Sequence, residues 1–504
     1  MKRSLLLLFF LILVFSVTNA QLPVFPGAEG FGRFIAAGRG GQVIKVTNLN
    51  DAGPGSLRSA VQTAGARIIV FEVGGEINLN SSLNITEPFI TIAGQTAPSP
   101  GITLSGYGIK IWTHDLLMQH IFVRHTEEDG ADAIDCHRNG DVVPYNIVID
   151  HVSVSWGRDE NLSFAPGGEN IMDNNSTFSN NIVAEGLGGY GTLISDGSRK
   201  FSAIKNLWIS HRERQPRIKG GVSANIINNV SYNIGSEYPT AVGPEIGPNY
   251  LNLIGNVHLA GPSTPNNSYQ FAATKGIDFG SQIYASDNKS DGGLYNSRIM
   301  DYLVDTPTLP LDGVSIVSSS EVVEYVVKNA GARPAERDGI IANEIGDPVD
   351  ERLISEVKSQ SGSVKSSIPE FPIPPSTFRA FTVPNNPNND DDGNGYTNIE
   401  EVLQLLAAEV EGRVITSVTD PKIQDIKIYP NPASTILTVQ MPLAVNDYLD
   451  VTINSLSGER ISRQKTFAKN GCLNLDISEL KSGMYYLVQV DYVKGLFTSK
   501  FVKK

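Results

Sequence analysis

Residues 201–232 read FSAIKNLWISHRERQPRIKGGVSANIINNVSY, and this stretch holds the pattern that decides the fold. Two of its apolar runs begin with an asparagine followed by an aliphatic residue, at Asn206 and Asn229. The same pair occurs at Asn181 and Asn256, so the pattern repeats in steps of 25, 23 and 27 residues. That step is typical of one coil of a parallel β-solenoid with variable loops. Asparagine suits the bends because it tolerates left-handed backbone and its amide can bond to the same position one coil above.

The sequence around this stretch, from about residue 40 to residue 260, is typical of short strands. Apolar and polar residues alternate in segments such as 42–46, 67–71, 146–150 and 250–254. Gly, Asn, Asp and Ser separate the segments, and long helical patterns are scarce. Alternation with period two indicates β-strands. The sequence therefore predicts an all-β solenoid in this part of the chain.

The centre of the quoted stretch, RQPRIK at residues 214–219, places three cations around Pro216. The chain as a whole is acidic, with 40 Lys and Arg against 53 Asp and Glu and a net charge of −13. An acidic chain is not expected to bind nucleic acid. A dense basic run on such a chain indicates a site for another anion, and the alternative is a solvated strand end. Proline restricts the preceding residue, so we expect Arg214 and Arg217 on a stiff, non-helical backbone.

The beginning of the chain is typical of a secretory signal peptide. Lys2 and Arg3 precede an apolar run at residues 5–17, and small or polar residues at 18–20 suit cleavage after Ala20. The run is short for a membrane span, so we expect an exported mature protein without a transmembrane segment. The two cysteines, Cys136 and Cys472, fall in different predicted domains, which excludes a disulfide framework. Cys136 lies in a strand-like segment and is expected to be a small buried hydrophobe.

The pattern changes after residue 297. Residues 318–330 and 350–358 are typical of helices, and a Pro- and Asn-rich linker follows. From about residue 423, short alternating strands with turn residues predict a small β-sandwich. We therefore divide the chain into a signal peptide (1–20), a β-solenoid with its C-terminal extension (21–365), a linker with a short helix (366–422) and a C-terminal module (423–504).

Within the linker, residues 390–401 read DDDGNGYTNIEE and fit the template of a calcium-binding loop. Oxygen ligands fall at Asp390, Asp392 and Asn394, Gly395 takes the turn position, and Glu401 stands at position twelve. A helix-like stretch follows. The alternative is a solvated acidic linker that caps this helix. If it binds calcium, we expect a structural clip without a catalytic role.

A series of motifs makes residues 25–260 recognisable. They are FPGAEGFG (25–32), GRGG (38–41), VTNL (46–49), GPGSLR (53–58), AGQTAP (93–98), DAI (132–134), NIVIDHVSVSW (146–156), DENL (159–162) and RQPRIK (214–219). In this order and spacing the chain resembles pectate lyases of polysaccharide lyase family 1, with weaker similarity to about residue 365. The resemblance implies a right-handed parallel β-helix that cleaves polygalacturonate, an acidic plant polysaccharide, by β-elimination.

The resemblance also implies roles for particular residues. By position, Arg214 corresponds to the base that removes the C5 proton, and Arg217 and Lys219 correspond to substrate-binding cations. Asp132 and Asp159 match the segments that bind an active-site Ca²⁺ ion. Such an ion suits an acidic enzyme on an acidic polymer, because it bridges carboxylates that otherwise repel each other. The ordinary pKa of arginine lies above ~12, so the role of Arg214 as a base comes from the resemblance alone.

Two positions depart from the family's pattern. Ser163 stands where a second acid is common, and Glu160 or Asp135 is expected to complete the metal site in its place. A lysine that is often found upstream has no counterpart in residues 188–194. His151 follows a strand-like run after Asp150, and we interpret it as a structural histidine.

The C-terminal module resembles the sorting domains of type IX secretion. The resemblance rests on IYPNPAS (428–434), LSG (456–458) and LKSGMYYL (480–487). It implies a partner in the secretion machinery and a protein that is secreted, or held at the outer surface, of a Gram-negative bacterium. We expect a monomer.

Two other functions fit parts of the sequence. The first is a solenoid glycoside hydrolase of the polygalacturonase type, because residues 217–219 spell RIK. Hydrolysis, however, needs paired carboxylates around the scissile bond, and the NTD and GHG segments that accompany RIK in those enzymes are absent. The second is a non-catalytic carbohydrate-binding adhesin with the same fold. The basic run and the acidic segment after Arg158 favour the lyase.

Overall fold

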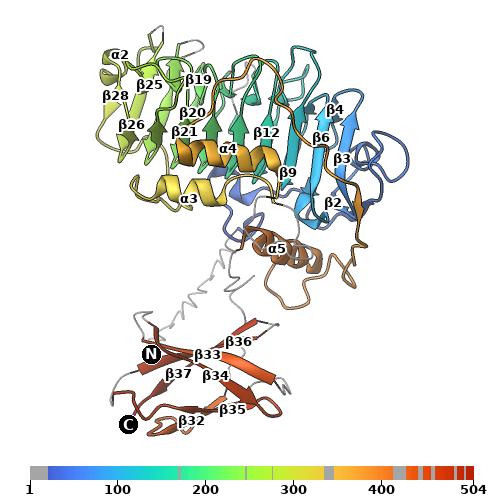
Figure 1. Ribbon diagram of the computed structural model, residues 1–504, viewed down its shortest axis with the longest axis vertical. Coiled ribbons are helices and arrows are strands. Elements are labelled where there is room, and N and C mark those ends of the chain that lie inside the picture. Colours follow the sequence, from blue (N-terminus) through green and yellow to red (C-terminus); the bar gives the residue numbers. More distant parts are fainter. Residues whose placement is uncertain are drawn as a thin grey trace, which may run out of the picture.

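The computed structural model describes residues 21–167, 172–244, 247–274, 276–333, 346–412, 427–440, 447–455, 460–481, 485–492 and 495–504. The predicted signal peptide, residues 1–20, lies outside the described residues. The described residues up to residue 333 form a parallel β-solenoid, as predicted (Figure 1). Its strands stack into three long sheets, and each coil contributes to them in turn.

Each sheet runs the length of the solenoid. The first contains β1 (Gln42–Val46), β2 (Arg67–Phe71), β5 (Ile90–Ala93), β8 (His114–Gln119), β11 (Tyr145–Asp150), β14 (Ser176–Ser179), β17 (Phe201–Ile204), β20 (Ser223–Ile227), β23 (Tyr250–Ile254), β26 (Gln282–Ser286) and β29 (Leu303–Val304). The second contains β4 (Leu83–Ile85), β7 (Ile109–Ile111), β10 (Ile134–His137), β13 (Leu162–Ala165), β16 (Thr192–Ile194), β19 (Arg217–Lys219), β22 (Thr240–Gly243), β25 (Tyr269–Ala273) and β28 (Gly293–Tyr295). The third contains β3 (Val73–Leu79), β6 (Ile102–Gly106), β9 (Ile121–His125), β12 (Ser153–Ser155), β15 (Ile182–Ala184), β18 (Leu207–Ile209), β21 (Val230–Tyr232), β24 (Val257–Leu259) and β27 (Lys289–Ser290), and β30 (Thr377–Phe378) joins it antiparallel to β3.

The repeating asparagines form a ladder along the bend between the first and third sheets. The side-chain amide of Asn181 donates to Asn206 Oδ1 at 2.9 Å, Asn206 donates to Asn229 at 3.0 Å, and Asn229 donates to Asn256 at 3.0 Å. The ladder continues to Asn288. The left-handed backbone lies one residue earlier than expected, for example at Lys205.

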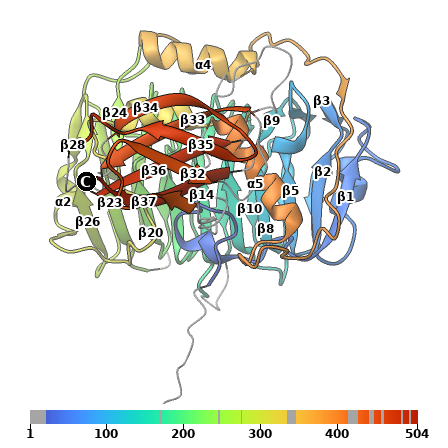
Figure 2. The same ribbon diagram turned by 90° about the horizontal axis from the view of Figure 1, so that it is seen from below.

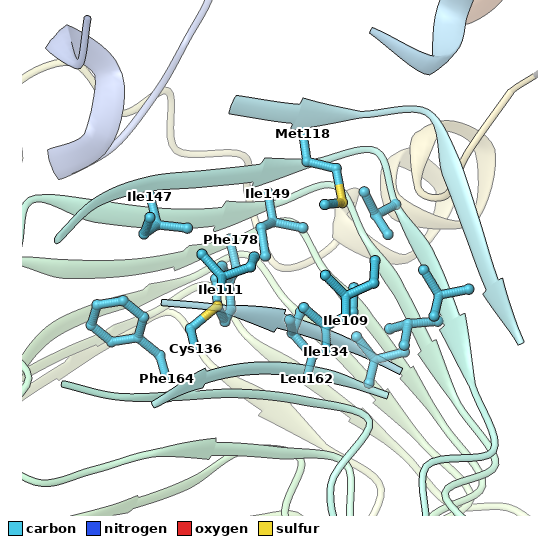
Figure 3. Packing of buried hydrophobic residues seen from close by; sticks show 14 of the residues in the cluster. Ile109, Ile111, Met118, Ile134, Cys136, Ile147, Ile149, Leu162, Phe164 and Phe178 are labelled. Atoms are coloured by element: carbon cyan, nitrogen blue, oxygen red, sulfur yellow. The ribbon is translucent and has the colours of Figure 1, made fainter. Parts of the chain in front are cut away.

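The interior of the solenoid is a stack of apolar side chains from all three sheets. Figure 3 shows part of it, where Ile109, Ile134 and Leu162 lie above one another on successive coils. Cys136 belongs to this stack, is fully buried and is not in a disulfide, as the sequence predicted. Burial of each large aliphatic side chain contributes roughly 1.5–3 kcal/mol to folding, so the stack is a main source of stability.

Several helices cover the outside of the solenoid. Short turns are η1 (Phe31–Phe34), α1 (Leu57–Val61), η2 (Gly94–Thr96) and α2 (Ser297–Met300). Helices α3 (Val322–Asn329) and α4 (Pro348–Ser359) pack on the third sheet, where Val326 and Leu353 meet Leu207 and Val230. Both helices overlap the segments that the sequence predicted as helical.

The segment that the sequence predicted as a linker packs on the solenoid over its described part, residues 366–412. Helix α5 (Asn398–Glu411) lies against the first sheet beside β5 and β8 (Figure 2), and Ile399 and Leu403 bury Ile68 and Val70. The helix begins with a capping box between Thr397 and Glu400. Composition alone suggested a free linker, whereas a few apolar residues in it are buried against the solenoid.

The C-terminal module consists of two antiparallel sheets. One contains β31 (Lys427–Tyr429), β32 (Ile436–Gln440) and β35 (Cys472–Asp476), and the other contains β33 (Asp447–Ser455), β34 (Arg460–Ala468), β36 (Tyr485–Tyr492) and β37 (Gly495–Val502). They share a small core that includes Leu437, Val451 and Leu473. This confirms the predicted small β module. Among the described residues, no helix is both long and apolar enough to cross a membrane.

Candidate active site

The residues predicted to carry chemistry meet at one edge of the second sheet. Asp132 precedes β10, Asp159 and Glu160 precede β13, and Arg214 precedes β19. Strands β10, β13, β16 and β19 are consecutive neighbours in this sheet. Because the strands are parallel, the loops that enter them lie side by side. The solenoid therefore stacks segments that are far apart in sequence into one site.

The acidic part of the site is a group of three carboxylates. One carboxylate oxygen from each of Asp132, Asp159 and Glu160 lies within 4.8 Å of the others. Asp132 and Glu160 are buried and Asp159 is exposed. Burial raises the pKa of Asp132 to about 7, the hydrogen bond from Ser163 opposes this shift, and Asp135 and Asp159 add to it. Clustered oxygen ligands of this kind fit a hard divalent cation such as Ca²⁺.

Ser163 holds Asp132 in place and supplies no carboxylate of its own. Its hydroxyl donates a hydrogen bond to Asp132 Oδ2, and the backbone N–H of Glu160 donates to Asp132 Oδ1 at 3.0 Å. Asp135, the other residue expected to compensate for Ser163, forms a second group with Asp132 and His137, again with ligand atoms within 4.8 Å. The two groups share Asp132, so this carboxylate is central to any cation bound here.

Arg214 lies between a carboxylate and an aromatic ring. Its guanidinium pairs with Glu160, and its central carbon lies 3.7 Å from the centroid of the Tyr190 ring. Burial lowers the pKa of Arg214, Asp159 and Asp132 oppose this, and Arg217 adds to the lowering. The backbone at Arg214 is left-handed, with φ 69°. A non-glycine residue held in this conformation stores of order 1–3 kcal/mol of strain.

Arg217 and Lys219 lie on β19 on either side of the buried Ile218. Because side chains alternate along a strand, both cations face outward on the same side of the second sheet. They extend the positive charge of Arg214 along this face.

Tyr190 is the contact of Arg214 that sequence reasoning missed. It lies in the glycine-rich segment 186–191, and both Arg212 and Arg214 approach its ring. The only sequence signal was a single aromatic residue among glycines, in the segment where a lysine was expected. Stacking of a guanidinium on an aromatic face holds the cation in a defined plane.

His151 does not belong to this site. Its Nδ1 lies 2.9 Å from Asp150, and with His120 and Glu411 it forms a buried cluster where α5 meets the first sheet. His120 Nδ1 accepts the N–H of Arg333, so His120 Nε2 carries the proton and donates to Glu411. A metal ion bound to His120 Nε2 would have to replace this proton. The structural interpretation of His151 agrees with this packing.

The predicted calcium loop brings its ligand positions together. The carboxylate of Asp390 accepts the backbone N–H groups of Asn394 and Gly395, at 2.9 and 2.8 Å, and the side chain of Asn394 bonds to Glu401. Asp392 accepts from the Asn394 N–H as well. Burial raises the pKa of Glu401, the Asn394 hydrogen bond opposes this, and Asp392 and Asp390 add to it. Whether the loop holds calcium stays a prediction.

The fold and the site together define a solenoid enzyme that places clustered carboxylates and an arginine on one sheet. The chain is 36% identical over 367 residues to a probable pectate lyase C of Neosartorya fischeri, covering 68% of this chain and 79% of that protein. It is 35% identical over 362 residues to a probable pectate lyase C of Aspergillus flavus, covering 68% and 78%. The chain belongs to the pectate lyase family.

Two further comparisons concern the C-terminal module and similar solved structures. Residues 427–504 match the model of the secretion system C-terminal sorting domain. Similar solved structures include jun a 1, the major allergen from cedar pollen, at 17% identity and a TM-score of 0.46, covering 60% of this chain and 92% of that chain. Pectate lyase II from Xanthomonas campestris pv. campestris is 14% identical with a TM-score of 0.43, covering 60% and 98%.

Proposed function

We propose that this protein cleaves pectate, the polymer of galacturonate, by β-elimination. The observation that carries the proposal is the group of Asp132, Asp159 and Glu160 directly beside the half-buried Arg214. The names of the family's curated members support the same substrate. A uronate polymer needs a site that combines cation-binding carboxylates with fixed positive charge.

Asp132, Asp159 and Glu160 are the residues that would hold Ca²⁺. Their fit rests on the three carboxylate oxygens that lie within 4.8 Å of one another, together with the raised pKa of Asp132, which follows first from its burial and then from the charges of Asp135 and Asp159. When bound, the ion would neutralise a substrate carboxylate and make the neighbouring C5 hydrogen more acidic. Arg217 and Lys219 bind carboxylates of the polymer from the outer face of β19.

Arg214 is the base in this proposal. A nitrogen of the neutral Arg214 side chain takes the proton from C5, the C5–H electron pair forms the C4=C5 double bond, and the C4–O bond to the next sugar breaks. The departing oxygen takes a proton from water, and Arg214 then returns its own extra proton to the solvent. Burial and the charge of Arg217 lower the pKa of Arg214, which favours the neutral base that this step requires. Tyr190 holds the guanidinium in its plane.

A direct assay tests the reaction. Elimination leaves a 4,5-unsaturated uronide that absorbs ultraviolet light, so incubation with unesterified polygalacturonate and calcium should raise the absorbance. New reducing ends without that absorbance would assign the protein to the hydrolases. Polymer binding without any product would assign it to the adhesins.

We also propose export through the type IX secretion system, which would take the protein to or beyond the outer membrane of a Gram-negative bacterium. The support is the match of residues 427–504 to a secretion sorting domain, together with the leader pattern at residues 1–20. In the producing cell, deletion of residues 427–504 should leave the solenoid in the periplasm, which fractionation followed by the uronide assay would detect.

A further inference from the structure

A fully buried histidine, His211, lies beneath the site where three loops converge. The acidic loop (157–161) carries Asp159 and Glu160. The tyrosine loop (186–191) carries Tyr190, and the arginine loop (211–216) carries Arg214. His211 opens the third loop and contacts the other two.

Its contact with the acidic loop fixes the position of its proton. Asn161 accepts the N–H of Gly157 on Oδ1 at 2.7 Å and donates from Nδ2 to the carbonyl of Ala184 at 2.7 Å, which determines the orientation of the amide. The same Nδ2 lies 2.9 Å from His211 Nε2. Nε2 is therefore the acceptor, and the proton of the neutral ring is on Nδ1.

The protonated Nδ1 faces the other end of the arginine loop. Gln215 Nε2 lies 3.0 Å from Nδ1, and Gln215 Oε1 is buried without a hydrogen-bond partner among the described residues. Because Nδ1 carries the proton, we assign the amide the other way round, so that its oxygen accepts the N–H. Gln215 is fully buried, its N–H donates to Pro239, and its carbonyl accepts from Ser231 and Thr240. The residue next to Arg214 is thus held by its own backbone hydrogen bonds and, through its side chain, by the ring of His211.

The tyrosine loop packs against the ring itself. A Cβ atom at Gly191 would lie 3.2 Å from His211 Cε1, and one at Gly186 would lie 3.2 Å from Cδ2. The loop therefore follows the ring closely at two positions on either side of Tyr190. The backbone N–H of Gly191 also donates to Glu213 at 3.1 Å, which joins this loop to the arginine loop.

We propose that His211 is the positioning residue of the site, a neutral imidazole that sets the mutual geometry of Glu160, Tyr190 and Arg214. Its role in the reaction rests on the proposed function, whereas its role in ordering the loops does not. Burial lowers the pKa of His211 to about 3, so the ring keeps the required single proton across the neutral pH range.

Four variants of the full mature chain test this. H211F keeps a flat aromatic ring, which is somewhat larger than imidazole, and loses both hydrogen bonds. H211N retains a donor toward Gln215, and H211Q retains an acceptor toward Asn161. H258F is the matched control, because His258 on β24 is also a buried neutral histidine, with its pKa lowered by burial to about 4, and the neighbours that act on this pKa, Ser231 and Asp291, lie outside the three loops.

We expect H211F to lower kcat at least about tenfold with KM changed less than about threefold, because misplacement of catalytic groups slows chemistry more than binding. H211N and H211Q should lie between H211F and the parent. In H211F, the amides of Gly157, Gly191 and Glu213 should exchange hydrogen faster. H258F should lower the melting temperature without lowering kcat and without faster exchange of these amides. Equal kcat in H211F and H258F would overturn the catalytic role.

The effect of His211 on the order of the loops can be tested independently of the proposed reaction. If the parent protein forms no unsaturated product, the proposed function fails, and hydrogen exchange alone decides on His211. Unchanged exchange of all three loops in folded H211F would then overturn its positioning role as well.

Discussion

Among the single residues of the site, Glu160 belongs to two interactions. Its carboxylate pairs with Arg214 and also belongs to the group with Asp132 and Asp159. A cation bound by that group would compete with Arg214 for the same oxygens. Asp159, by contrast, is exposed and makes no ion pair within 4 Å among the described residues. Asp159 is therefore the residue at which metal binding can be weakened without breaking an ion pair of Arg214, although loss of its charge further lowers the pKa of Arg214.

We expect Asp159→Asn to raise the calcium concentration for half-maximal activity by roughly tenfold or more, since one charged ligand is lost. Excess chelator should stop the parent enzyme. Asp141→Asn is the control, because it removes one exposed carboxylate from a neighbouring loop. Full activity on unesterified polygalacturonate in excess chelator would contradict the calcium role.

Arg214→Lys should lower kcat by at least about a hundredfold, the usual contribution of a general base. Lysine keeps the charge but loses the planar group that stacks on Tyr190. Arg212→Lys is the matched control, because Arg212 approaches the same ring at 5.1 Å but is largely exposed. For both variants, kcat should be measured with the uronide assay, and the melting temperature should be measured to confirm folding. Near-parental turnover in folded Arg214→Lys would remove this residue from the base role.

His258 predicts a pH dependence of stability. Its pKa is lowered to about 4 by burial in the folded chain, against ~6.5 when unfolded. Between these values the unfolded chain binds more protons, so the free energy of unfolding falls as the pH falls, by at most about 1.4 kcal/mol per pH unit. His258→Phe should therefore lose less melting temperature between pH 7 and pH 5 than the parent does. An equal loss in both proteins would show that His258 is not responsible.

Among the strands, loops and helices, the coils of the solenoid could be predicted from the sequence. The contacts that loops and helices make with distant parts of the chain could not. Asn181, Asn206 and Asn229 revealed the coil length because a ladder needs one asparagine per coil at a fixed place. The acidic loop and the arginine loop could be assigned from motifs, whereas the tyrosine loop could not, and nothing local showed that His211 joins the three. Its hydrogen bond to Asn161 spans 50 residues and exists only after the coils stack. Helix α5 was predicted as a helix, whereas its docking depends on Ile399 and Leu403 meeting strand residues far away in sequence.

The calcium loop before α5 gives an element-scale prediction. The chain ending at Gly412 contains Asp390, Asp392, Asn394 and Glu401, and the chain ending at Pro384 contains none of them. We expect the shorter chain to bind one calcium ion fewer in equilibrium dialysis, since only the loop is lost and the group around Asp132 remains. Equal stoichiometry in the two chains would identify the loop as a helix cap without a metal.

At the scale of the whole molecule, the same pair of chains tests how the parts depend on each other. Removal of residues 413–504 should leave kcat and the melting temperature unchanged, because the solenoid core is complete without them. Removal of α5 as well exposes Ile68 and Val70 and should lower the melting temperature by at least about 5 °C. At 25 °C kcat should stay within about twofold, because α5 covers the first sheet and Arg214 lies at the second. Loss of catalysis in a folded chain ending at Pro384 would place α5 in the catalytic unit.

The distribution of the helices has a further consequence. Helices α3 and α4 pack on the third sheet and α5 packs on the first, whereas the carboxylates and Arg214 lie at the second. A site on the flank of a rod-shaped body needs no free chain end, so a long polymer can settle on it at any point along its length. If the proposed function holds, the viscosity of a polygalacturonate solution should collapse while only a few per cent of its linkages have been cut, and the first products should be long fragments in place of single sugars.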